Sequence, residues 1–330
     1  MTAEHQSDSD ATTSRHEFDA IIVGTGQAAP ALANRLTAAG WSVAVIERGR
    51  VGGTCVNTGC TPTKALVASA HVARLAARSA EYGVLTGCAP RVDMTAVKAR
   101  VAAIVRADRS GLEAWLSGMP RCTFIRGHAR FESRREVRVD HQILRADKIF
   151  LNVGGRARIP LFAGIDKIDY LTNVDMVELD QAPQHLVVVG GGYVGLEFAQ
   201  VFRRFGSQVT VIEKGARLLP HEDENISAQI KALLEHEGIM VRVAAECIQF
   251  GSRPDGIAVG VDCKTGARGA GRRRSRPHRP RCHVGRRTLH AARPDHAHSS
   301  HRLGADSDHS RRTVGTVLNN RERQVMACAS

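Results

Sequence analysis

The chain has 330 residues, of which 43% are hydrophobic, and a formal net charge of +13. This length accommodates about two domains with substantial cores, no apolar run is long enough for a membrane helix, and the first sixteen residues lack the apolar centre of a signal peptide. The eight cysteines are too sparse for a disulfide-scaffolded secreted domain. We therefore expect a cytoplasmic protein without a membrane partner.

The positive charge is concentrated in the last part of the chain. Residues 264–330 contain fifteen Arg, one Lys and four acidic residues, whereas the first 263 residues contain 30 basic and 29 acidic residues. Stretches of this tail, such as residues 271–281, show neither helical nor strand periodicity. The body of the protein is therefore almost neutral.

The first predicted unit is a strand, a glycine-containing turn and a helix. A short buried strand is expected over Phe18–Val23, and the alanine-rich helix after the turn ends near Gly40. A second strand, Ser42–Ile46, leads to Glu47, whose carboxylate is placed to accept hydrogen bonds from a ribose. Small residues let the backbone approach a pyrophosphate at the helix N-terminus. The alternative is an ordinary tight turn; the favoured hypothesis is a dinucleotide site formed by Gly24, Gly26, Ala29 and Glu47.

Two cysteines lie just ahead of the next predicted helix, Lys64–Ala80. Cys55 and Cys60 are five residues apart, a spacing at which a disulfide needs a distorted first turn, and Gly59 permits one. Such a bridge is expected to be strained and reducible, and the helix dipole with Lys64 favours a thiolate at Cys60 after reduction. The alternatives are ordinary buried cysteines or half of a zinc site, but no second close cysteine pair follows in the body, so no metal is expected.

The same strand, turn and helix pattern recurs later in the chain. A strand over His185–Val189 is followed by a glycine-rich turn, a helix through Phe205, and a strand over Gln208–Ile212. The predicted nucleotide contacts are Gly190, Gly192, Gly195 and Glu213.

Two consecutive dinucleotide sites indicate a flavoprotein, because a flavin must receive hydride from a second nucleotide. The expected cofactors are FAD and NAD(P)H. Glu213 favours the free 2′-hydroxyl of NADH, whereas Lys214 and Arg217 weaken the discrimination against NADPH. NADH is slightly favoured.

The segment Gly52–Lys64 resembles the active-site segment of the class I pyridine nucleotide-disulfide oxidoreductases, the group of dihydrolipoamide dehydrogenase, glutathione reductase and mercuric reductase. The resemblance covers about residues 17–263 and is greatest to mercuric reductase-like members. It implies that Cys55 is the interchange thiol that meets the substrate. It also implies that Cys60 is the charge-transfer thiol that faces the flavin.

The resemblance also implies roles for residues outside the cysteine pair. Lys64 and Glu197 would form a buried ion pair near the flavin N5, and Tyr193 would cover the flavin until nicotinamide displaces it. The alternatives are two solvated helix charges and a tyrosine that packs on the sheet. The implied FAD contacts are Gly24, Gly26, Ala29, Glu47, Gly53, Thr54 and Gly154.

The expected fold class is α/β, with two Rossmann-like nucleotide-binding domains and without the family's C-terminal dimerisation domain. The predicted divisions are a disordered N-terminus (1–16), an FAD-binding domain with the cysteine pair (17–155), an NAD(P)-binding domain (156–263) and a basic tail (264–330). Family members are homodimers in which each active site borrows a histidine from the partner. No segment of the tail resembles the one that supplies that histidine.

Three interpretations of the tail remain open. It is a disordered basic segment that contacts nucleic acid, a divergent folded domain, or the product of a change of reading frame near Gly266, which is favoured. The predicted function is an FAD-dependent NAD(P)H:disulfide oxidoreductase that acts on a small-molecule or disulfide substrate and is impaired by its C-terminal end. The alternative is a non-enzymatic nucleotide-binding remnant whose Arg-rich tail contacts nucleic acid.

Overall fold

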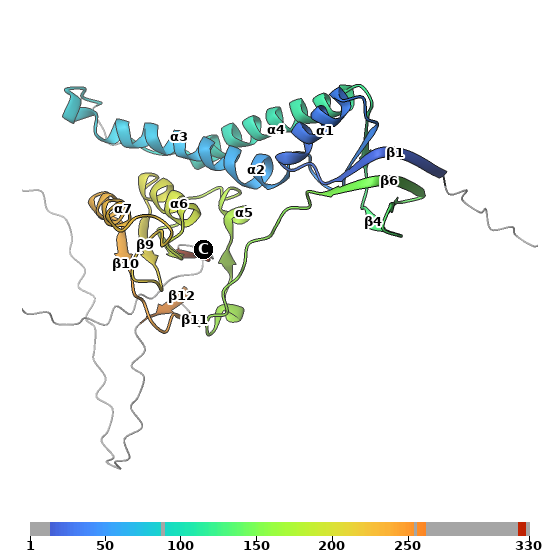
Figure 1. Cartoon of the computed structure of the whole chain (residues 1–330). Helices are drawn as coiled ribbons and strands as arrows, with labels where there is room; N and C mark the ends of the chain where they lie inside the picture. The colour runs from blue at the N-terminus through green and yellow to red at the C-terminus, as the bar shows by residue number, and fades with distance from the viewer. Residues whose placement is uncertain (1–13, 87–89, 254–255, 262–322, 328–330) are drawn as a thin grey trace, which may run out of the picture.

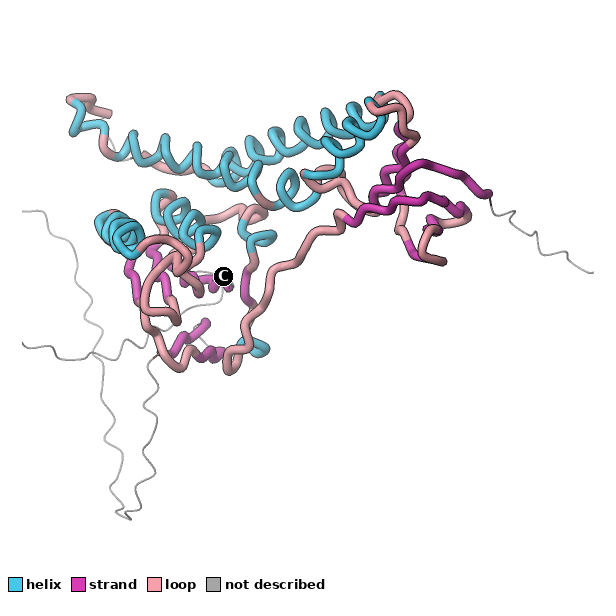
Figure 2. Tube along the Cα trace, in the orientation of Figure 1, coloured by secondary structure: helices cyan, strands magenta, loops and turns pink. Residues whose placement is uncertain are grey.

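The computed structural model describes residues 14–86, 90–253, 256–261 and 323–327. These residues form two sheet-centred lobes, and a pair of long helices runs over both (Figure 1). An extended segment, residues 152–162, joins the first lobe to the second (Figure 2). The predicted boundary between residues 155 and 156 falls in this segment. None of the helices in the described part of the chain is both long and apolar enough to span a bilayer.

The first lobe is built on a six-stranded sheet of order β3-β2-β1-β6-β5-β4. Its first four strands in that order are parallel, and β5 and β4 extend the sheet as antiparallel strands. Alternate residues of β1 face opposite sides, so that Ile22 packs against α1 and the end of α4 while Ile21 packs against β5 and β6. The elements are β1 (Ser14–Val23), α1 (Ala28–Ala38), β2 (Val43–Glu47), α4 (Met94–Gly118), β3 (Cys122–Arg126), β4 (Arg130–Phe131), β5 (Glu136–Val139) and β6 (Gln142–Leu151).

The first strand begins earlier than its apolar residues indicate. It starts at Ser14 rather than Phe18, so the prediction of a disordered segment through residue 16 is wrong for its last three residues. Residues 14–18 are mostly exposed, but they pair in register with residues 142–146 of β6. Backbone hydrogen bonds to a neighbouring strand extend β1 here, and no apolar pattern is needed for that.

The second lobe repeats this plan with a five-stranded parallel sheet of order β10-β9-β8-β13-β7. Helices α6 and α7 cover one face, and the antiparallel hairpin β11-β12 covers the other. Strands β8 and β9 have the predicted bounds. The elements are η2 (Ile165–Lys167), β7 (Tyr170–Leu171), α5 (Asn173–Met176), β8 (His185–Val189), α6 (Tyr193–Arg204), β9 (Gln208–Ile212), α7 (Glu224–His236), β10 (Met240–Arg242), β11 (Gln249–Arg253), β12 (Gly256–Gly260) and β13 (Arg323–Ala327).

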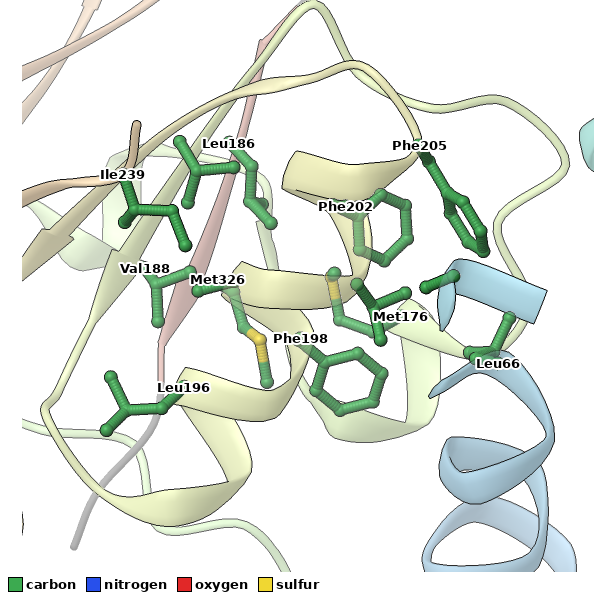
Figure 3. Packing of buried hydrophobic residues seen from close by; sticks show 14 of the residues in the cluster. Leu66, Met176, Leu186, Val188, Leu196, Phe198, Phe202, Phe205, Ile239 and Met326 are labelled. Atoms are coloured by element: carbon green, nitrogen blue, oxygen red, sulfur yellow. The ribbon is translucent and has the colours of Figure 1, made fainter. Parts of the chain in front are cut away.

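Strand β13 comes from the predicted disordered or out-of-frame tail. It lies between β8 and β7 and is parallel to both, so the prediction of disorder for the tail is wrong for residues 323–327. Met326 is completely buried in the core beside α6 (Figure 3). Strand β13 pairs with β8 on one side and with β7 on the other, so it completes the hydrogen-bonded ladder between them. The rest of the tail lies outside the described residues.

Helix α3 (Cys60–Ala77) packs on α6 of the second lobe. It follows α2 (Gly53–Thr58), packs beside α4, and ends before η1 (Ser79–Tyr82). Leu66 and Ala70 of α3 belong to the same hydrophobic cluster as Phe198 and Phe202 of α6, and Figure 3 shows Leu66 next to Phe205 and Met176. The second lobe therefore does not close its core alone: α3 supplies part of it.

A buried carboxylate adds polar contacts between α3 and the second lobe. The Glu237 side chain, just after α7, is only 4% exposed and pairs with Arg204 of α6 at 2.8 Å and with Arg74 of α3 at 3.0 Å. Gln200 donates a further hydrogen bond of 2.9 Å. Burial by itself would raise the pKa of Glu237, but the two guanidinium groups and the Gln200 amide outweigh it and hold the pKa below its ordinary value of about 4.5.

We expect Met326→Ala to lower the free energy of unfolding by about 2–5 kcal/mol, because it leaves a cavity in the core of the second lobe. Met240→Ala is the matched control: that side chain is 52% exposed on β10, and its loss is expected to change the free energy by less than about 0.5 kcal/mol. Urea unfolding followed by circular dichroism measures both. Equal effects of the two substitutions would show that β13 does not pack in this sheet.

Glu237→Gln is expected to cost about 3 kcal/mol at pH 7, because it leaves Arg204 buried without its counter-charge. Since the pKa of Glu237 is depressed in the folded state, its contribution is complete above about pH 4.5 and is lost as the pH falls through the folded pKa. The stability difference between wild type and variant should therefore shrink in acid. Glu235→Gln, which breaks only the exposed pair with Lys231, should cost less than about 0.5 kcal/mol at any pH.

Candidate functional site

The two cysteines of the predicted redox pair lie at the junction of two helices. Cys55 is in the first turn of α2 and Cys60 is the first residue of α3, with Gly59 between the helices. Both are free thiols, and they lie close enough for Cys60 to affect the pKa of the Cys55 thiol. The break at Gly59, where the backbone has φ −126° and ψ −113°, folds the chain back so that residues five apart in sequence meet. The backbone distortion that brings the cysteines together is therefore the break between α2 and α3, and not a bent first turn of α3.

The two thiols differ in their surroundings. Cys60 is exposed and Cys55 is partly buried. Burial raises the pKa of the Cys55 thiol, and the neighbouring Cys60 and the negative charge of Asp108 raise it further.

The structure brings Lys64 and Glu197 together as an ion pair between α3 and α6. The implied burial of this pair is not observed: the Lys64 side chain is 62% exposed and that of Glu197 is 34% exposed. Lys64 lies one turn after Cys60 on the same helix, so the ion pair stands beside the cysteine pair. Tyr193, the first residue of α6, is 73% exposed, so it does not pack on the sheet.

The first predicted nucleotide loop runs from the end of β1 to α1. Gly24 has φ +96°, and a Cβ at this position would lie 2.2 Å from the carbonyl oxygen of Asn152, so only glycine fits. Gly53 at the start of α2 approaches the same loop: its Cβ would lie 2.8 Å from the Cα of Gly26. Ala29 is fully buried in α1, whereas Thr54 is exposed. The loop thus joins β1, α1 and the helix that carries Cys55.

One buried polar atom beside this loop has no partner within the described structure. The Nδ2 of Asn152, which follows β6, is buried and makes no hydrogen bond, and its side chain lies against Gly26. An unpaired buried donor costs about 1–3 kcal/mol unless a ligand accepts from it. A phosphate or ribose oxygen of FAD at this loop would do so, and the residues present therefore fit this cofactor. Gly154, also expected to contact FAD, has φ +70° and open space around it.

The two carboxylates that end the second strand of each lobe are held in the same way. Glu47 accepts from the amide and hydroxyl of Thr25 at 3.0 and 2.7 Å and from the amide of Gly49 at 2.8 Å. Glu213 accepts from the amides of Gly191 and Gly215. Each carboxylate thus spans its nucleotide loop and the turn after its own strand, and lone pairs remain for ribose hydroxyls.

The two helices that follow the nucleotide loops have no side chain that caps or neutralises their N-termini. Neither α1 nor α6 has a side-chain cap or an acidic residue in its first turn, whereas α4 is capped by Asp93 and α5 by a capping box. The positive end of each dipole is therefore left for an anionic ligand. At the second loop Gly190 has φ +116°, Gly192 is the N-cap of α6, and Gly195 is buried within that helix.

Two polar contacts near the cysteine pair could not be predicted from a sequence pattern. The Nδ2 of Asn173, at the start of α5, donates to the carbonyl of Thr58 at 3.2 Å and so ties the second lobe to the turn between the cysteines. The hydroxyl of Thr61 donates to Asp108 of α4 at 3.1 Å. Neither residue pair is close in sequence, and no motif marks them. The signal that could have marked Asn152 is a polar residue directly after β6, a strand that runs parallel to β1.

Within the described ranges, no group of three or more His, Cys, Asp or Glu side chains is close enough together to hold a metal ion. The geometry combines a dithiol, an adjacent ion pair and two glycine-containing loops at helix N-termini.

Residues 18–269 match the family described as pyridine nucleotide-disulphide oxidoreductase. The chain belongs to this family. A mercuric reductase of Bacillus cereus is 35% identical over 224 residues, which are 68% of this chain and 35% of that protein. A dihydrolipoyl dehydrogenase of Bacillus subtilis is 34% identical over 229 residues, 68% of this chain and 50% of that protein.

The solved structure of the HOCl-induced flavoprotein disulfide reductase RclA from Escherichia coli is also similar, with a TM-score of 0.64 and 31% identity. The match covers 74% of this chain and 53% of RclA. The chain thus spans about half or less of the length of these relatives. Members of the family are FAD-dependent oxidoreductases that use NAD(P)H, and the α/β architecture of this chain agrees with them.

We expect Gly24→Ala to destabilise the first lobe by at least about 1–3 kcal/mol, because the added Cβ meets the Asn152 carbonyl at a backbone angle that alanine rarely adopts. Gly111→Ala is the control: Gly111 lies in α4 with no atom within 4 Å of the added carbon, and the change should stabilise by up to about 1 kcal/mol. Urea unfolding measures both. A neutral Gly24→Ala would mean that the loop is more open than the structure shows.

Proposed function

We propose that the chain is an FAD-dependent NAD(P)H:disulfide oxidoreductase that uses Cys55 and Cys60 as its redox-active pair. The observation that carries the proposal is the meeting of these thiols at the α2–α3 junction, beside the Lys64–Glu197 pair and the first nucleotide loop. Bound FAD would accept hydride from NAD(P)H and deliver two electrons to the Cys55–Cys60 disulfide.

The residues of the first lobe have separate tasks in this reaction. The loop from Gly24 to Ala29 and the unpaired Nδ2 of Asn152 would hold the pyrophosphate and ribose, with Glu47 on the ribose hydroxyls. The N-terminus of α3 would favour negative charge on the Cys60 sulfur. Cys55 then attacks the acceptor, and Cys60 displaces the product by re-forming the disulfide.

The second lobe would bind the nicotinamide nucleotide at Gly190, Gly192 and Gly195. Glu213 is fixed by the amides of Gly191 and Gly215, so its charge stays where a 2′-phosphate would lie. The fixed carboxylate of Glu213 supports NADH as the preferred donor. Tyr193 is exposed at the start of α6, as expected of a side chain that nicotinamide displaces.

The acceptor is proposed to be a small disulfide. Relatives named mercuric reductase and a solved copper(II) complex of RclA connect the family with metal ions as well. The two adjacent thiols at the α2–α3 junction support disulfide exchange as the reaction of this pair.

A visible spectrum of the purified protein tests the proposal. We expect bound flavin and, on addition of NADH, a long-wavelength charge-transfer band. Cys60→Ser should abolish the band, because it removes the thiolate next to the flavin, whereas Cys122→Ser, on the distant strand β3, should retain it. A folded protein that remains colourless after incubation with FAD would support the nucleotide-binding remnant instead.

A further inference from the structure

An acidic side chain lies close to the cysteine pair and has no part in the electron path described above. Asp108 projects from α4, which packs against both α2 and α3 (Figure 1). Its Oδ2 accepts from the Thr61 hydroxyl at 3.1 Å, and Thr61 directly follows Cys60. This hydrogen bond holds the Asp108 carboxylate next to the start of α3, where Cys60 lies.

The charge of Asp108 reaches the thiol that is expected to meet the acceptor. Asp108 is the charged side chain whose field contributes to the raised pKa of Cys55, after burial and the effect of Cys60. Asp108 is exposed and Cys55 is partly exposed, so an acceptor that reaches Cys55 from solvent enters the field of this carboxylate. An exposed charge at short range acts on a charged ligand with moderate strength that falls with salt.

Neighbouring basic groups do not cancel this charge. Lys64 on α3 is paired with Glu197. Arg100 on α4 donates to the Ala65 carbonyl at 2.9 Å and to the Ser69 hydroxyl at 3.3 Å. Arg106 and Arg109 lie on α4 as well, but at two residues before and one residue after Asp108 they point to other faces of the helix.

We propose that Asp108 is a specificity-determining residue that makes the Cys55–Cys60 pair select disulfides with positively charged groups over disulfides with carboxylates. The inference rests on the proposed disulfide exchange. In that exchange the Cys55 thiolate attacks one sulfur of the acceptor, forms a mixed disulfide and releases the first thiolate. The Cys60 thiolate then attacks the Cys55 sulfur and releases the second thiolate, so the dithiol loses two electrons and the acceptor gains them.

Single-turnover exchange tests this step without any need for FAD or NADH. The full chain is reduced with dithiothreitol, freed of reductant, and mixed with cystamine, 3,3′-dithiodipropionate or neutral bis(2-hydroxyethyl) disulfide. The measured quantity is the ratio of the cystamine rate to the dithiodipropionate rate. A changed thiolate fraction of Cys55 affects both rates equally, so the ratio reports only the discrimination by charge.

We expect Asp108→Asn to lower this ratio by about three- to tenfold relative to wild type, and Asp108→Lys to lower it further. The rate with the neutral disulfide normalises each variant. Glu113→Gln removes one negative charge from the same helix at a side chain that pairs with Arg126, and it should leave the ratio within about twofold of wild type. Added salt should reduce the wild-type ratio towards that of Asp108→Asn.

An unchanged ratio in Asp108→Asn and Asp108→Lys would overturn the inference, even if the protein binds flavin and reacts with NADH. Loss of the ratio in Glu113→Gln as well would assign the effect to net charge instead of Asp108. If wild type exchanges with none of the three disulfides while both thiols titrate as free, the inference and the proposed acceptor class both fail. A colourless protein that exchanges with the expected ratio would retain the inference and remove only the flavin-dependent step.

Discussion

The contact between α3 and α6 is the constraint on which the rest of the structure depends. Leu66 and Ala70 pack with Phe198 and Phe202 in one cluster, and Arg74 reaches Glu237 one turn further along. Because α3 begins at Cys60, fixing this helix also fixes the thiol and Lys64 relative to the second lobe. The ion pair from Lys64 to Glu197 is the consequence at the other end of the same interface. The buried apolar side chains thus hold α3 against α6, and the two ion pairs add contacts at both ends of this interface.

The two lobes hold their nucleotide loops with the same arrangement of a carboxylate and backbone amides. In each, a carboxylate after the second strand binds the amide of the nucleotide loop and the amide of the following turn: Glu47 with Thr25 and Gly49, and Glu213 with Gly191 and Gly215. Residues alternate between two covered faces in β1 and in β8. A parallel strand covered on both sides needs an apolar run, which is why both units are visible in the sequence.

Local patterns were sufficient to predict much of the fold and part of the candidate site. The bounds of β8 and β9, the glycine turns and the cysteine pair follow from hydrophobic runs and short-range stereochemistry. The early start of β1 and the strand β13 could not be predicted this way, because both depend on pairing with strands more than 100 residues away. The contacts of three polar residues could not be predicted for the same reason, because each contacts a residue that only the tertiary fold brings near. These residues are Asn152, Asn173 and Asp108.

Strand β13, the last described segment, packs in the same hydrophobic cluster as the helix that carries Cys60. Met326 lies in the same cluster as Leu66 of α3, so the volume that it fills bears on the helix that carries Cys60. Without that side chain the cluster would lose one of its fully buried members, and α6, which carries Glu197, would lose support on its sheet side. Distance along the chain therefore does not separate residues 323–327 from the cysteine pair. The strand supports the position of Glu197, and through the ion pair it supports the setting of Lys64 beside Cys60.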